Sequence, residues 1–357
     1  VIATDHAPHP ESTKIVDFKN AARGVVGLES AFPMIYSSEI FSIEEIKKLP
    51  QNEIPGIKLF LGSSTGNMLV DDYDVIEELF KISKVPIVVH SEDDKIINKN
   101  LEKFKKEYGK ENLKPEMHAK IRSSIACLKS TEKIIALARK TNARLHVFHL
   151  STGVESKLFS NDKPLEDKKI TIEVCIHHLS FNENDYKKKK GFIKWNPSIK
   201  TVSDQQALWE SLNEDRIDVI ATDHAPHTLN EKSNNYLNCP SGGPLVQHSL
   251  NMMFEHYLNK KITLEKIVQK MCHNPAILFR VNKRGFIRKN YFADMVIIDP
   301  RKNYTVDSNN ILYKCGWSPF EGTKFNSQIT HTFINGNLVY ENGLINEDFR
   351  GKKISFE

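Results

Sequence analysis

Four side chains in this sequence have the types and positions of metal ligands in a hydrolytic site. His90, His149 and Asp223 each close a short apolar run of β-type residues, and Lys58 lies within another such run. Two imidazoles and a carboxylate from successive strand ends suit zinc, which prefers nitrogen and oxygen ligands and can leave a position open for catalysis. Each histidine alone would more simply be structural, with its ring bonded to a backbone carbonyl. The prediction of a zinc site therefore rests on these residues taken together and not on any one of them.

Lys58 is the sharpest of these clues, because an ammonium without a partner is costly to bury in a sheet. Reaction with CO₂ would turn Lys58 into an anionic carbamate that can bridge two metal ions, and bound metal would stabilise this labile group. A salt bridge inside the protein is the alternative explanation.

The strand that ends at Asp223 occurs twice in the chain. Its nine residues, Val219 to His227, are identical to residues 1–9. The run reads as a strand that delivers a carboxylate and two imidazoles to the mouth of a barrel, where the proline stops the hydrogen-bond ladder. We therefore ask which copy works and what the other has replaced.

Composition favours one large globular unit. The chain has 357 residues, of which 27% are charged and 39% hydrophobic, enough for a barrel of about 250 residues and a small second domain. It has no apolar run near the roughly 18 residues of a membrane span. The net charge of +5 comes largely from scattered lysines, and we read the run Lys187 to Lys190 as a solvated loop and not as a nucleic-acid site.

Two further features concern the cellular setting. The five cysteines form no CxxC pair and read as reduced thiols of a cytoplasmic protein. The first residues contain neither an initiator Met nor a basic region, so we expect neither a signal peptide nor a natural N-terminus.

Apolar and amphipathic segments alternate along the first two thirds of the chain. This alternation predicts a parallel sheet closed as an α/β barrel, followed by a small β-domain. The expected strands are 56–61, 86–90, 144–150, 170–175, 192–195 and 217–222, with helices near 73–83, 95–108, 117–141, 203–212, 245–258 and 264–271, and later strands at 293–299 and 329–340 around an Asn335-Gly336 turn. A barrel needs eight strands, and these six with the opening residues 1–4 make seven, so at least one is missing.

The motifs then identify a family. Residues 56–69, 88–92, 146–151, 176–179, 196–199 and 221–227 follow one another as in dihydroorotases, which belong to the amidohydrolase superfamily. The resemblance covers about 41–357 and implies a TIM-type (β/α)8 barrel of the metal-dependent hydrolase kind. We expect three parts: a duplicated strand-8-like segment (1–42), the barrel (43–290) and a partial small β-domain with the C-terminal tail (291–357).

The resemblance also implies roles for individual residues. Lys58 matches a carboxylated lysine that bridges two zinc ions, His90 and His149 match ligands of one ion, and Asp223 matches the aspartate that binds zinc and shuttles the proton. The implied substrate contacts are Asn196, His227, Ser241 and Gly242. The implied reaction is the reversible hydrolysis of dihydroorotate to N-carbamoyl-aspartate in pyrimidine biosynthesis, a small-molecule reaction that involves neither nucleic acid nor membrane.

One family feature is missing from the sequence. Dihydroorotases begin their barrel with a strand ending in His-x-His and an Arg that grips the substrate, whereas residues 1–42 resemble the eighth-strand segment of another dihydroorotase branch. The chain thus lacks the expected strands 1 and 2.

Three explanations are open. A fusion or gene-assembly artefact could have removed half of the metal site, leaving one ion in place of two. Residues 1–4 could instead fill the first-strand slot, with Asp5, His6 or His9 as ligands. Finally, a homo-oligomer or a pyrimidine-pathway partner could complete the barrel, or the chain could be a non-catalytic scaffold. A hydantoinase or allantoinase activity is the alternative reaction.

Overall fold

The computed structural model describes residues 43–50, 52–62, 72–349 and 351–357. The first copy of the repeated segment, with Asp5, His6 and His9, lies outside the described residues, and so does the expected segment 1–42 as a whole. No helix in the described ranges is long and apolar enough to cross a membrane.

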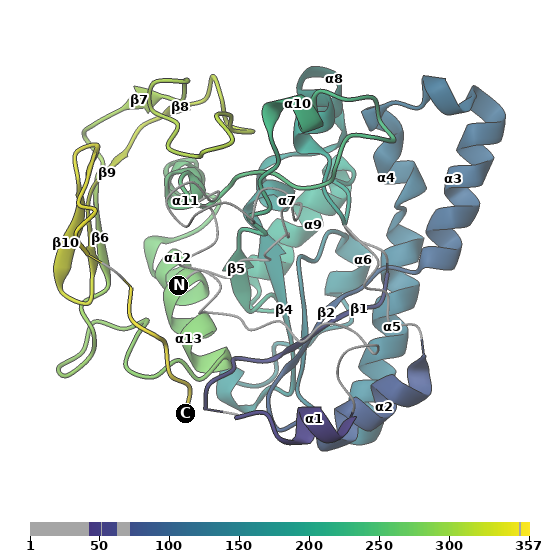
Figure 1. Ribbon diagram of the computed structural model, residues 1–357, viewed down its shortest axis with the longest axis horizontal. Helices are drawn as coiled ribbons and strands as arrows, with labels where there is room; N and C mark the ends of the chain where they lie inside the picture. The colour runs from purple at the N-terminus through teal and green to yellow at the C-terminus, as the bar shows by residue number, and fades with distance from the viewer. Residues whose placement is uncertain (1–42, 51, 63–71, 350) are drawn as a thin grey trace.

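A parallel sheet forms the centre of the described chain (Figure 1). Its strands lie side by side in chain order, and each pairs in parallel with the next. All but one of their side chains are buried, as expected for strands covered on both faces. They are β1 (Ile57–Phe60), β2 (Ile87–His90), β3 (Leu145–Val147), β4 (Ile170–Cys175) and β5 (Val219–Ala221), which confirm five of the six predicted barrel strands.

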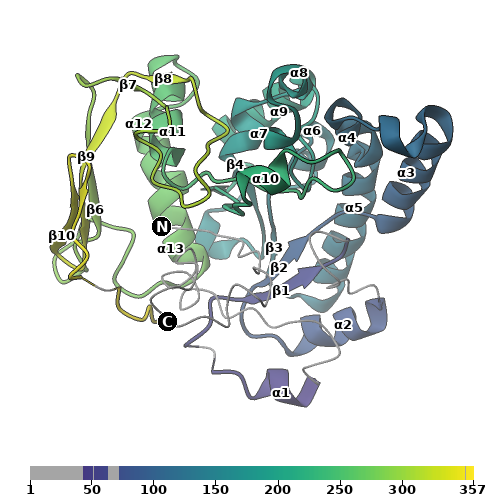
Figure 2. The same ribbon diagram turned by 45° about the horizontal axis from the view of Figure 1, so that its top comes forward.

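Helices follow the strands and cover the sheet. Figure 2 shows α2 and α5 beside β1 to β3. Local sequence sets several helix starts: Asp72 caps α2 and Asp93 caps α3 through side-chain oxygens that accept backbone N–H groups, and Thr201 forms a capping box with Asp204 at α9. The helices up to β5 are α1 (Ile43–Lys47), α2 (Tyr73–Ile82), α3 (Asp94–Tyr108), α4 (His118–Ile121), α5 (Ser124–Thr141), α6 (Gly153–Ser156), α7 (Ile176–Ser180), α8 (Tyr186–Lys189) and α9 (Val202–Asn213).

The predicted strand at 192–195 is wrong. Residues Lys190–Ile193 form a 3₁₀ helix, η6, in which the N–H of Lys194 donates to the carbonyl of Gly191 and Lys190 has a φ of 50°. The strand-like pattern arose because Ile193 and Trp195 both point into the core, where both are 0% exposed. A compact turn therefore buries the same apolar residues that a strand would bury.

Two predicted helices differ from the structure in their limits. The segment predicted as one helix at 117–141 is interrupted between α4 and α5 at Arg122, whose side chain is buried. The helix predicted at 264–271 continues past Pro275 to Leu278. Its residues form α12 (Leu264–Val268) and the π-helix η7 (Gln269–His273), which continues into α13 (Asn274–Leu278). Pro275 lies in the first turn of α13, where the missing N–H is tolerated.

A small antiparallel sheet lies apart from the parallel one, separated from it by α11 (Ser249–Leu258), α12 and α13 (Figure 1). Its order is β11-β10-β9-β6, with the predicted hairpin turn at Asn335 and Gly336, whose φ angles are 52° and 82°. The strands are β6 (Met295–Asp299), β9 (Gln328–Ile334), β10 (Asn337–Glu341) and β11 (Leu344–Ile345); β7 (Tyr304–Thr305) and β8 (Lys324–Phe325) form a separate pair.

The last residues return to the segment just before β1. The N–H of Phe356 donates to the carbonyl of Asn52 at 3.0 Å, and Lys353 Nζ lies 2.7 Å from Glu53 Oε2. A backbone bond from Glu357 to the carbonyl of Arg280 ties the same end to the residues after α13. Segments far apart in sequence are thus joined at one place.

A buried carboxyl group lies among the helices. Glu155 in α6 is 2% exposed, and its oxygens accept hydrogen bonds from Thr131 Oγ1 at 2.7 Å and Thr152 Oγ1 at 2.8 Å. Burial raises the pKa of Glu155 to about 7, although both hydrogen bonds act in the opposite direction. The folded protein therefore takes up a proton here that the unfolded chain, with a pKa near 4.5, releases.

This shift predicts a loss of stability with rising pH. Because the folded pKa is raised, the contribution of Glu155 is fully present below about pH 4.5 and is lost as pH rises to about 7. Glu155→Gln should remove that dependence, on the order of 3 kcal/mol over this window. Urea unfolding at pH 5 and pH 8 measures it, with Glu132→Gln, a change at an exposed position of α5, as the control. Equal pH dependence in wild type and Glu155→Gln would contradict the assignment.

Candidate metal and substrate site

The four predicted metal ligands lie at or near the carboxyl ends of the parallel strands. Lys58 is within β1, His90 is the last residue of β2, and His149 and Asp223 each follow the end of a strand by two residues. Because parallel strands in sequential order have their carboxyl ends on the same side, these positions face one region. All four side chains are buried, with exposures between 0% and 8%.

His90 and His149 are in direct contact. His90 Nδ1 lies 3.1 Å from His149 Nε2, and the rings meet edge to face. Two nitrogen ligands of one tetrahedral zinc ion, each about 2.0–2.1 Å from the metal, lie about 3.4 Å apart. The spacing of this pair is thus close to what a shared ion requires, and His149 Nδ1 is a buried nitrogen with no hydrogen-bond partner.

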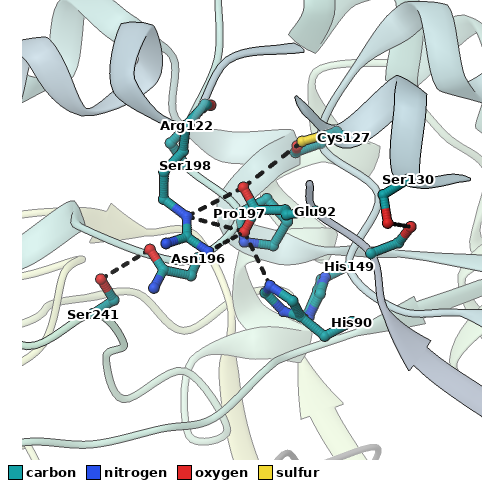
Figure 3. A network of polar contacts seen from close by, with 12 residues as sticks. His90, Glu92, Arg122, Cys127, Ser130, His149, Asn196, Pro197, Ser198 and Ser241 are labelled. Atoms are coloured by element: carbon teal, nitrogen blue, oxygen red, sulfur yellow. Dashed lines mark hydrogen bonds and ion pairs between the residues drawn. The ribbon is translucent and has the colours of Figure 1, made fainter. Parts of the chain in front are cut away.

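A buried ion pair orients His90. Its Nε2 lies 3.0 Å from Glu92 Oε2, and Arg122 Nε donates to both oxygens of Glu92 at 3.1 and 3.0 Å (Figure 3). Burial raises the pKa of Glu92, but Arg122 and His90 outweigh it and hold this pKa well below its usual value. An ionised Glu92 beside Nε2 favours the tautomer with its proton on that nitrogen, which would leave Nδ1, the atom nearest His149, for a metal ion.

His149 is held at an unusual backbone turn. Its φ is 40°, a left-handed conformation that costs a non-glycine residue about 1–3 kcal/mol. The neighbouring N–H groups of Phe148 and Leu150 donate to carbonyls of Val89 and Glu173, on the strands on either side, which fixes the turn. Burial, then His90 and Lys58, lower the pKa of His149 well below its usual value, so its ring is neutral, as a metal ligand must be.

Asp223 has the same kind of backbone, with a φ of 47°. After it the chain pairs with the segment from Gly243 onward: Ala225 donates to the Gly243 carbonyl, and His224 Nδ1 accepts the N–H groups of Leu245 and Val246. The sequence predicted a helix from 245, but residues 246–248 form a turn and α11 begins at Ser249.

Of the four predicted ligands, the structure brings His90 and His149 into direct contact. Among the residues that the structure describes, no group of three or more His, Cys, Asp and Glu side chains could hold a metal ion. Lys58 Nζ lies 4.6 Å and 4.8 Å from the ring centres of Phe60 and Phe148, where a cation is favoured by the ring faces. Its charge also acts on His149, as the pKa of that histidine shows.

The four predicted substrate contacts come together. Ser241 Oγ donates to Asn196 Oδ1 at 3.0 Å, and His227 Nε2 donates to the Ser241 carbonyl at 3.1 Å. The N–H of Gly242 donates to the carbonyl of Lys194, two residues before Asn196. The cluster therefore joins the segment after η6 to the loop that follows α10 (Leu229–Lys232).

Aromatic residues hold this cluster from behind. Trp317 Nε1 donates to the His227 carbonyl at 2.7 Å. His118 spans the carbonyl of Trp195 at 2.7 Å and the hydroxyl of Tyr236 at 2.8 Å, and His177 stacks on Trp195 with ring centres 4.4 Å apart. His177 and His178, which the sequence suggested as neighbours of the site, are thus buried supporting residues; His178 Nε2 donates to the Pro197 carbonyl.

Sequence reasoning missed the residues that support the site. Glu92 lies two positions after His90, within the 88–92 motif, but the sequence alone gave it no role. Arg122 and the buried lysines Lys194 and Lys232 carried no such signal. Arg122 and Lys194 bind groups 30 to 45 residues away, and Lys232 binds carbonyls of the loop just after it, which no sequence pattern marks.

Comparison with known proteins places the chain in a family. The sequence profile of the amidohydrolase family matches residues 14–339. The chain belongs to the amidohydrolase family. Members of this family are metal-dependent, typically on zinc.

Individual amidohydrolases agree with this. The chain is 31% identical to a dihydroorotase of Pyrococcus furiosus over 83% of its own length and 64% of that protein's, and 29% identical to a dihydroorotase of Clostridioides difficile over 90% and 73%. An L-hydantoinase (dihydropyrimidinase) from Arthrobacter aurescens superposes with a TM-score of 0.75 at 25% identity, over 82% of this chain and 66% of that one. A D-hydantoinase from Thermus sp. gives 0.77 at 19%, over 90% and 70%.

These comparisons confirm the predicted fold class, an α/β barrel of the TIM type with a small β-domain. The chain spans slightly less than two thirds of the length of the Pyrococcus dihydroorotases it matches. The boundaries predicted at 42 and 290 stay predictions.

The geometry at Gly242 gives a test of the substrate cluster. Gly242 has a φ of 126°, and a Cβ there would lie 2.6 Å from the Ala225 carbonyl oxygen and 2.9 Å from Ala225 Cβ. Gly242→Ala should therefore push residues 225–227 away and lower the free energy of unfolding. Gly322→Ala, at a φ of 81° with nothing within 4 Å, carries the backbone strain without the clash. We expect Gly242→Ala to cost about 2 kcal/mol more than this control in urea unfolding; equal costs would show that the loop has room.

Proposed function

We propose that the chain hydrolyses a cyclic amide, with dihydroorotate and N-carbamoyl-aspartate as the two sides of a reversible reaction in pyrimidine biosynthesis. The observation that carries this proposal is the closeness of two groups, the His90–His149 pair and the cluster around Asn196. They are joined through Glu92 and Arg122, because Ser198 Oγ, two residues after Asn196, donates to the Arg122 carbonyl at 3.0 Å (Figure 3). The similarity to curated dihydroorotases supports the same substrate.

The cluster suits an anionic ring. The side-chain amide of Asn196 can donate a hydrogen bond to a carboxylate or a ring carbonyl, and the ring of His227 and the backbone at Ser241 and Gly242 lie beside it. His227 is only partly buried, so its ring can face a ligand. In our proposal these four residues bind and orient the substrate.

The proposed chemistry is an addition of water followed by cleavage of the ring C–N bond. Water adds to the amide carbonyl carbon and gives up a proton, and the ring nitrogen leaves as that proton reaches it, so atoms and charge balance. Asp223 would accept the proton from the water and pass it to the nitrogen. Its left-handed backbone at a strand end holds the carboxylate there without the freedom of a loop.

His90 and His149 would hold zinc, with Asp223 and a carboxylated Lys58 as the oxygen donors. When bound, zinc supplies a Lewis acid that activates water at neutral pH and polarises the amide carbonyl. The close nitrogen pair, and the tautomer that Glu92 favours on His90, support this donor set.

We propose one or two ions per chain, in a cytoplasmic protein whose five cysteines are all free thiols. A homo-oligomer or a pyrimidine-pathway partner would complete the barrel.

Two other functions compete with this proposal. A hydantoinase or allantoinase activity is favoured by the L-hydantoinase from Arthrobacter aurescens, which is similar in structure. A scaffold without catalysis would use the same fold with an incomplete metal site. Parallel assays with dihydroorotate, hydantoin and allantoin on zinc-loaded protein separate the three.

Asp223 provides the test of the proposed reaction. Asp223→Ala should lower dihydroorotate turnover by about 100-fold or more, because the proton carrier is removed. Asp5→Ala, the same change in the other copy of the repeat, should leave turnover unchanged. If Asp5→Ala removes the activity and Asp223→Ala does not, the working copy has been assigned wrongly; turnover of hydantoin alone would transfer the proposal to the alternative reaction.

Zinc retention tests the role of Lys58. Bicarbonate should increase the zinc that the dialysed protein retains, because it supplies the CO₂ of the carbamate. In Lys58→Met the same treatment should have no effect, and His90→Ala should retain less zinc at any bicarbonate concentration. A native mass spectrum showing a full metal complement beside an unmodified Lys58 would exclude the carbamate.

A further inference from the structure

Two buried lysines lie directly behind the predicted substrate contacts. Lys232, the last residue of α10, is 1% exposed, and Lys194, two residues before Asn196, is 8% exposed. Burying an ammonium group is costly, and burial lowers the pKa of Lys232 to about 7 and that of Lys194 to about 8. So costly an arrangement points to a specific use for these charges.

Both ammonium groups bind backbone carbonyls of one loop. Lys232 Nζ donates to the carbonyls of Pro240 and Gly242, each at 2.8 Å, and to that of Lys194 at 3.3 Å. Lys194 Nζ donates to the carbonyls of Tyr236 and Cys239. Four carbonyls between residues 236 and 242 are thus held by two side chains.

The same contacts join this loop to the segment that carries Asn196. The Lys194 carbonyl accepts both the N–H of Gly242 and the ammonium of Lys232. This shared acceptor fixes the spacing between the two backbones, across which Ser241 Oγ donates to Asn196 Oδ1.

We propose that Lys194 and Lys232 are positioning residues that hold the 236–242 loop in the arrangement in which Ser241, Gly242 and His227 meet Asn196, and that they thereby set the affinity for the ring substrate. The part concerning affinity rests on the function proposed above. Neither lysine takes part in the reaction, so the effect belongs to binding and not to the chemical step. The loop is the element through which both act.

Lys270 offers a matched control elsewhere in the fold. It is 2% exposed, its Nζ donates to the Ile217 carbonyl at 2.7 Å, and it pairs with Asp215 at 2.9 Å. Both partners precede β5, so this lysine lies at the amino end of that strand and the predicted site follows its carboxyl end. Replacing Lys232 or Lys270 with Met removes one buried ammonium of the same kind in each case. Only Lys232→Met removes hydrogen bonds to the 236–242 loop.

The first experiment compares kinetics in the zinc-loaded full chain. Lys232→Met should raise the KM for dihydroorotate about tenfold while kcat stays within about threefold, which corresponds to about 1.4 kcal/mol of lost binding. Lys270→Met should leave KM within about twofold, even where it lowers the melting temperature equally. Equal rises in KM in both variants, or an unchanged KM in Lys232→Met, would overturn the proposal. If Lys232→Met does not fold, Lys194→Met, which frees two carbonyls, is expected to show the same split with a smaller rise.

The second experiment does not depend on activity. Hydrogen exchange should accelerate at the amides of Cys239 and Gly242 in Lys232→Met and stay at the wild-type rate in Lys270→Met. Wild-type protein that neither binds nor turns over dihydroorotate would refute the proposed function, and exchange would then decide the positioning role alone. Unchanged exchange in Lys232→Met would refute that role whatever the activity.

Discussion

The site depends on one buried ion pair, Glu92 with Arg122. Glu92 is 0% exposed, and its carboxylate receives the guanidinium of Arg122 and the ring of His90. Removing one partner of such a pair typically costs 3–5 kcal/mol, because the other charge remains buried alone. Here the loss would reach further: the histidine pair would lose its orientation, and the Arg122 carbonyl, which accepts from Ser198, would lose its fixed place beside the substrate cluster.

This arrangement separates two tasks. The sheet supplies rigidity: β2 and β3 bring His90 and His149 into contact, and the neighbouring strand bonds hold the left-handed turn at His149. The loops carry the proposed ring contacts, and the backbone carbonyls of the 236–242 loop are held by Lys194 and Lys232. The left-handed backbone at His149 is therefore held by hydrogen bonds to the neighbouring strands, whereas the 236–242 loop is held by side-chain contacts.

The sequence alone was sufficient for the strand ends and insufficient for their supports. A buried parallel strand has a local signature, an apolar run, so the positions of His90, His149 and Asp223 could be derived from their neighbours in the chain. The prediction of a strand at 192–195 failed because a compact turn can bury Ile193 and Trp195 as a strand would. Lysines are usually exposed by type, and the burial of Lys194 and Lys232 is set by carbonyls from a loop more than 30 residues away in one case. The bonds of Lys194 to the 236–242 loop, and of Lys232 to the Lys194 carbonyl, are long-range and leave no local pattern in the sequence.

The return of the last residues to the segment before β1 has a consequence for the order of assembly. Each strand of the parallel sheet pairs with the next in the chain, so the sheet can grow during synthesis as each segment emerges. The bond from Phe356 to the carbonyl of Asn52 cannot form in that way, because its donor is made some 300 residues later. The segment just before β1 therefore gains its contacts with residues 353–356 only after those late residues are made, whereas the pairing of β1 with β2 needs no such delay.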